Sequence, residues 1–87
     1  MKTFDSLWHE LEARIHSGDT SSKTVQLIDS GVHAIGKKIM EEAGEVWLAS
    51  EYQGNDELAT EIAQLIYHLQ VMAQARGLTI EEIYGKL

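Results

Sequence analysis

Four side chains that can donate an oxygen ligand occur in two pairs, one on each side of a predicted turn. In "KKIMEEAGEVWLASEY" (residues 37–52), Glu42 and Glu45 lie three residues apart, and Glu61 and Gln64 have the same spacing after the turn. Residues three apart lie on the same face of a helix. Each pair is therefore expected to project from one helical face.

The face that carries these acids borders the apolar side of its helix. Glu42 follows Ile39 by three residues and precedes Val46 by four, which places it beside an apolar stripe, and Glu61 has the same relation to its own stripe. Surface helices normally keep carboxylates in water. Acids next to the core side of two helices therefore indicate a functional cleft between those helices.

An antiparallel hairpin would bring the two pairs together. Residues at the same height in such a hairpin have position numbers with a constant sum, and Glu42 with Gln64 and Glu45 with Glu61 have the same sum. The centre then falls at Gln53, at the edge of the turn. The sequence predicts that Glu45 faces Glu61 and that Glu42 faces Gln64.

Converging carboxylates repel one another and lose hydration unless they are protonated or neutralised. Mg²⁺ prefers carboxylate oxygens and leaves positions open for water and phosphate, so we predict a Mg²⁺ site, with Mn²⁺ as an alternative. A di-iron site is excluded because no His stands three residues after any Glu. Zinc is disfavoured because the chain has no Cys and its four His form no ligand-spaced pair beside the acids.

Two lysines and one further acid lie close to this cluster. Lys37 and Lys38 come one turn before the acids, where they could reach a phosphate next to the metal. Lys38 also lies four residues before Glu42, so the two could simply neutralise each other. Glu41 is either a further ligand or a solvent-exposed acid.

Helices are expected to position these residues, and the fold class is all-α. The pattern favours four or five helices around a long antiparallel helical hairpin. A first helix is expected over residues 3–17, where Gly18 stops it, and an apolar stripe then runs from Val25 to Val46 through Gly31. A turn is expected at residues 53–56, with Asn55 as the cap of a helix that ends at Gly77. A capping box from Thr79 to Glu82 opens the last helix. Whether one helix or two span Gly31 stays open.

Composition limits the class of protein. The 87 residues predict a single domain, 1–87, whose small core favours a homodimer that completes a larger helical bundle. A net charge of −7 argues against nucleic-acid binding. No apolar run approaches a membrane span and none resembles a signal sequence, so we expect a cytoplasmic protein that does not bind membranes.

The segments "KKIMEEAGEVWLA" and "LATEIAQLIYHLQVMAQARGLTIEEIY" resemble the phosphoribosyl-ATP pyrophosphatases of histidine biosynthesis. More broadly, they are similar to the all-α nucleoside triphosphate pyrophosphohydrolases of the MazG type. The family pattern E-E-x-x-E followed by E-x-x-D maps onto Glu41, Glu42, Glu45 and Glu61. Gln64 departs from it, since it stands where the broader pattern has Asp. An amide can bind Mg²⁺ but adds no charge, which leaves the number of metal ions open.

The resemblance implies Mg²⁺-dependent hydrolysis of the α–β phosphoanhydride of phosphoribosyl-ATP, with the metal held by Glu42, Glu45, Glu61 and Gln64. The products would be phosphoribosyl-AMP and pyrophosphate. Glu41 or Glu45 would then accept the proton of the attacking water. Two alternatives are a MazG-type enzyme acting on other nucleoside triphosphates and a non-enzymatic helical interaction module with solvated acids.

Overall fold

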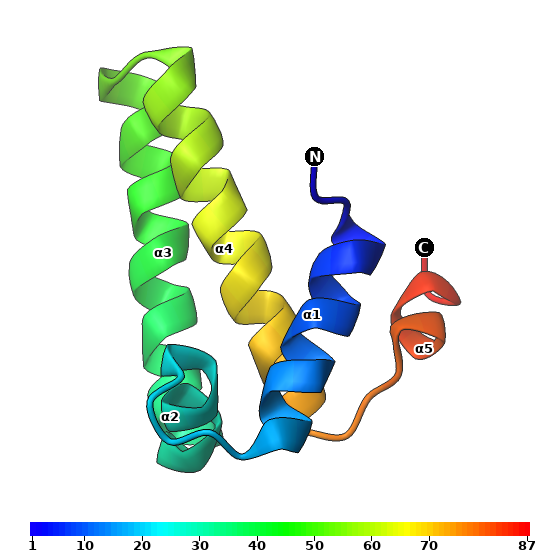
Figure 1. Cartoon of the computed structure of the whole chain (residues 1–87). Coiled ribbons are helices and arrows are strands. Elements are labelled where there is room, and N and C mark those ends of the chain that lie inside the picture. The colour runs from blue at the N-terminus through cyan, green and yellow to red at the C-terminus, as the bar shows by residue number, and fades with distance from the viewer.

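The computed structural model describes residues 1–87, and every regular element in it is an α-helix. The helices are α1 (Phe4–Ser17), α2 (Lys23–Ser30), α3 (Val32–Tyr52), α4 (Asn55–Ala75) and α5 (Ile80–Tyr84). Helices α3 and α4 form a long antiparallel hairpin, α1 packs on the lower part of α4, α2 crosses the base of the hairpin, and α5 lies beside α1 (Figure 1). The predicted all-α fold and helical hairpin are confirmed.

Local capping sets most of the helix ends. Thr3 forms a capping box with Ser6 at the start of α1, and Gly18 ends that helix with a left-handed φ of 66°. Ser22 caps α2 by accepting a hydrogen bond from the Val25 amide. Thr79 opens α5 and forms the predicted capping box with Glu82.

Gly31 divides the continuous apolar stripe into two helices. Its φ of 92° and ψ of 165° lie in a region that only glycine adopts readily, so the chain turns between α2 and α3. Apolar residues on both sides of this turn, Leu27 and Ile28 of α2 and Ile35 and Ile39 of α3, belong to one core cluster. The question left open by the sequence is therefore settled in favour of two helices.

The start of α4 differs from the sequence expectation. Asn55 is the first residue of the helix and not its cap, and Gly54, which has no side chain to accept a hydrogen bond, takes the cap position. Asp56 and Glu57 instead place negative charge in the first turn, where it complements the helix dipole. The connection between α3 and α4 thus consists of only Gln53 and Gly54.

The core lies in the lower half of the molecule. One cluster joins α1, α3 and α4 through three fully buried residues, Leu11, Ile35 and Val71. A second joins α1, α4 and α5 through Trp8, Ala73 and Ile80. Side-chain amides of α4, from Gln70 and Gln74, donate hydrogen bonds to backbone carbonyls of α1 at 3.0 Å each, which fixes α1 on α4.

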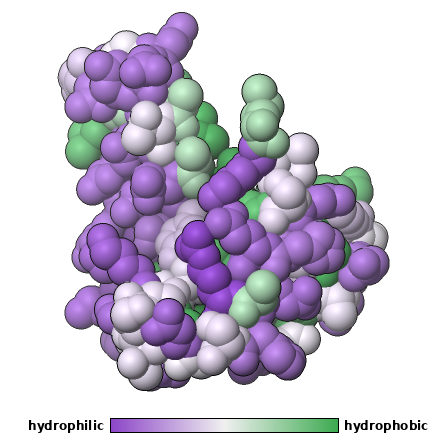
Figure 2. Space-filling model, viewed as in Figure 1, coloured by the Kyte–Doolittle hydropathy of each residue, from purple (hydrophilic) through white to green (hydrophobic).

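The upper half of the hairpin has no such cover. Figure 2 shows apolar surface interrupting a largely hydrophilic face in this region. Met40, Trp47, Leu48 and Tyr52 of α3 are exposed, and Trp47 leaves 65% of its surface accessible. No helix of the structure combines the length and apolar character that a membrane crossing needs.

Candidate metal centre and adjoining cavity

The α3–α4 hairpin brings three carboxylates together. Ligand oxygens of Glu42, Glu45 and Glu61 all lie within 4.8 Å of one another. Glu42 and Glu61 are half-buried, whereas Glu45 is exposed. Glu45 and Glu61 come from facing helices and lie within this distance, as the antiparallel geometry of the hairpin predicts.

Two oxygens in this cluster are buried without a partner. Oε2 of Glu42 and Oε2 of Glu61 accept no hydrogen bond and are closed off from solvent. None of the three acids takes part in an ion pair, because the basic groups that form ion pairs bind Glu10, Glu12 and Glu41 instead. Buried carboxylate oxygens without partners are costly and therefore favour a bound cation.

The pKa of Glu61 reflects its acidic neighbours and its partial burial. Its pKa is raised above the ordinary value, first because its carboxyl group shares a hydrogen bond with Glu45, then because it loses hydration, and finally because Glu45 and Glu42 are negatively charged. The protein alone therefore disfavours full ionisation of the cluster. A divalent cation would reverse that preference.

The spacing of the three oxygens suits a small octahedral ion. Mg²⁺ binds oxygen at about 2.0–2.1 Å, so neighbouring ligands lie about 3 Å apart and opposite ligands about 4.2 Å apart. Oxygens within 4.8 Å of one another are close to this spacing. The donor set, consisting of carboxylates without nitrogen or sulfur, is the one that Mg²⁺ and Mn²⁺ prefer.

The other predicted site residues lie around this cluster. Gln64, one turn after Glu61, lines a cavity next to the carboxylates together with Lys38. Lys38 pairs with Glu41 at 3.4 Å, so the alternative pairing of Lys38 with Glu42 is wrong. Lys37 and Glu41 are both exposed.

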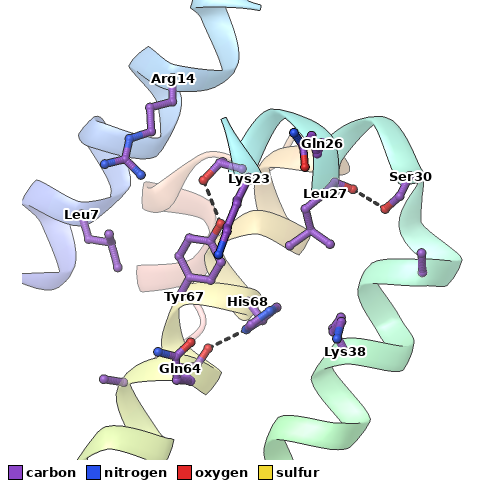
Figure 3. Close-up of a pocket in the computed structure, with 13 residues that line it drawn as sticks. Leu7, Arg14, Lys23, Gln26, Leu27, Ser30, Lys38, Gln64, Tyr67 and His68 are labelled. Carbon is purple, nitrogen blue, oxygen red and sulfur yellow. Dashed lines mark hydrogen bonds between the residues drawn. The ribbon is translucent and has the colours of Figure 1, made fainter. Parts of the chain in front are cut away.

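Four helices line the adjoining cavity, which is open to solvent and has a volume of about 840 Å³ (Figure 3). Arg14 lines it from α1, Lys23 and Thr24 from α2, Lys38 from α3, and Gln64, Tyr67 and His68 from α4. A hydrogen bond of 2.7 Å between the hydroxyls of Thr24 and Tyr67 joins two walls of the cavity. The volume is typical of a small-molecule site.

Sequence reasoning did not identify Arg14, Lys23, Tyr67 or His68 as functional. These residues come from three helices, and Thr24 and Tyr67 are 43 positions apart in the chain. No spacing rule within one helix relates them. Only the packing of α1 and α2 across the hairpin brings them together.

Comparison with known proteins agrees with the geometry. The family model described as phosphoribosyl-ATP pyrophosphohydrolase matches residues 4–87. The phosphoribosyl-ATP pyrophosphatases of Streptomyces coelicolor and Streptomyces avermitilis are each 53% identical to this chain, and each comparison covers 99% of the chain and 97% of the relative. The chain therefore belongs to the phosphoribosyl-ATP pyrophosphohydrolase family.

Proposed function

We propose that this chain, as a single domain over residues 1–87, hydrolyses the α–β phosphoanhydride of 1-(5-phosphoribosyl)-ATP. Water is consumed and phosphoribosyl-AMP and pyrophosphate are released, which is the second step of histidine biosynthesis and would take place in the cytoplasm. Family membership supports the reaction class. The observation that carries the site is the group of three carboxylates on facing helices, with two buried oxygens that lack partners.

In this proposal Glu42, Glu45 and Glu61 hold Mg²⁺, and the Gln64 amide oxygen is a further neutral ligand. The bound ion would supply positive charge to the phosphate oxygens and activate water for attack. The rigid hairpin keeps the three carboxylates together before the substrate arrives. Little reorganisation is then needed during the reaction.

We propose that Glu45 accepts the proton of the attacking water. Among the three clustered acids Glu45 is the exposed residue, which makes it the one most open to solvent. Glu41, the other candidate from the sequence, is held by Lys38. We propose that Glu41 positions the Lys38 ammonium group, which binds a substrate phosphate, and that Lys37 adds positive charge nearby.

The exposed part of the hairpin supports a homodimer. A monomer rarely leaves several large apolar residues together in water, and Trp47, Leu48 and Tyr52 occupy the uncovered half of α3. A second copy packed here would complete a larger bundle. Trp47→Glu is expected to produce a monomer in sedimentation velocity, whereas a wild-type protein that is monomeric at micromolar concentration would contradict the dimer.

The direct test is incubation of the purified protein with phosphoribosyl-ATP and Mg²⁺, scored for pyrophosphate. Release is expected for the wild type and should fall by at least about 10- to 100-fold for Glu42→Gln, since one charged ligand is lost. Equal activity on common nucleoside triphosphates would favour the MazG-type alternative. If no pyrophosphate is released from any triphosphate, the remaining alternative is a non-enzymatic helical interaction module.

A further inference from the structure

The cavity beside the carboxylates is positively charged in an acidic protein. The chain has 14 acidic and seven basic residues, yet three of the seven, Arg14, Lys23 and Lys38, line this cavity, and no acid does. Lys23 forms no ion pair, and Glu10, the partner of Arg14, is shared with Lys2. Positive charge therefore remains available for an anion.

The basic residues occupy two sides of the cavity. Lys38 and Gln64 come from the hairpin, one turn from Glu42 and Glu61 respectively, so their side adjoins the carboxylates. Arg14 and Lys23 come from α1 and α2 and line the cavity from another side than Lys38 (Figure 3). A ligand that spans the cavity would meet positive charge at both ends.

His68 adds a hydrogen-bond acceptor to the wall between them. Its side chain is more than nine-tenths buried, and its Nδ1 lies 2.8 Å from the Gln64 backbone carbonyl. Because a carbonyl can only accept, Nδ1 donates this hydrogen bond, and in the neutral form of the ring Nε2 is then an acceptor. A sugar hydroxyl is a suitable donor for that nitrogen.

Phosphoribosyl-ATP differs from ATP by a ribose that carries a 5-phosphate. Resting on the function proposed above, we propose that the cavity binds this phosphoribosyl group, with Lys23 and Arg14 on its phosphate and His68 on a ribose hydroxyl. These residues contact the substrate away from the bond that breaks. They determine which triphosphate is accepted.

The test compares Lys23→Met, Lys23→Arg and the control Lys86→Met, which removes an exposed lysine outside the cavity. The kcat/KM for phosphoribosyl-ATP is measured together with the inhibition constant of ribose 5-phosphate, which carries the sugar phosphate without the triphosphate. Loss of one charge-assisted hydrogen bond should lower kcat/KM by about 10- to 100-fold and raise the inhibition constant of ribose 5-phosphate by a similar factor. Lys23→Arg should largely restore both values.

Each outcome decides the inference. If the wild type is active and Lys23→Met stays within twofold of Lys86→Met, or if ribose 5-phosphate does not compete, the inference is wrong. Unchanged thermal stability of Lys23→Met excludes a folding defect as the cause of a loss. If the wild type does not hydrolyse phosphoribosyl-ATP, the proposed function fails. Nuclear magnetic resonance titration with ribose 5-phosphate then tests separately whether the cavity binds a sugar phosphate. Chemical-shift changes at Lys23 and His68 would support that binding, and their absence would overturn it.

Discussion

Replacing Glu61 by Gln should have opposite effects on the metal-free and the metal-bound protein. Without metal, the variant is expected to be more stable than the wild type at pH 7, because it removes a carboxylate whose ionisation the cluster disfavours. With Mg²⁺, the same change removes one of three charged ligands. The stabilisation that Mg²⁺ provides should then largely disappear.

The size of the metal effect follows from binding linkage. At a Mg²⁺ concentration 100 times the dissociation constant, binding only to the folded state adds about 2.7 kcal/mol, which for a domain of this size raises Tm by roughly 10–20 °C. Loss of supporting groups around a metal weakens binding by about 10- to 100-fold, and loss of a direct ligand should cost at least as much. A 100-fold weaker site would gain only about 2–3 °C under the same conditions.

The assay is thermal unfolding followed by circular dichroism, in chelator and across a Mg²⁺ titration. Glu57→Gln is the matched control, since it removes the same charge from the same helix one turn before Glu61 and outside the cluster. Its response to Mg²⁺ should equal that of the wild type. If Mg²⁺ stabilises Glu61→Gln as much as Glu57→Gln, the three carboxylates do not form the metal site.

Two further predictions concern pH and the helix break. The pKa of Tyr84 is raised because its hydroxyl donates a hydrogen bond to Asp5. The stability that this hydrogen bond contributes is therefore complete below pH 10 and is lost as pH rises through the pKa of Tyr84 in the folded protein. Tyr84→Phe should remove this alkaline fall in Tm, whereas the control Tyr52→Phe should retain it. Gly31→Ala should lower the free energy of unfolding by about 1–3 kcal/mol in denaturant titrations, because φ at this position is 92° while no atom lies within 4 Å of an added methyl group. An unchanged midpoint would show that the chain turns there without strain.

The sequence was most informative where the determinants are local or periodic. The stop at Gly18 and the capping box at Thr79 depend on residues within one turn, and both were predicted correctly. The facing of Glu45 and Glu61 followed from helical period and antiparallel geometry. The carboxylate cluster is therefore predictable from residue spacing.

Other features depend on packing that spacing does not encode. The apolar stripe runs through Gly31 because residues of both helices join one core cluster, so only the backbone geometry revealed the break. Lys38 has acids both three and four residues ahead, and the choice of Glu41 is a matter of side-chain orientation. The cavity with Lys23 and His68 requires four helices to be placed in space, which no single pattern describes.

The two-residue connection between α3 and α4 has a consequence for how the site can change in evolution. Gln53 and Gly54 provide no ligand and lie outside the cluster, yet their number sets which residues of the two helices stand opposite one another. One inserted residue that extended either helix would rotate Glu61 by about 100° relative to Glu45, since a helix turns once in 3.6 residues. The length of this connection therefore bears on the metal site, although neither of its residues belongs to the cluster.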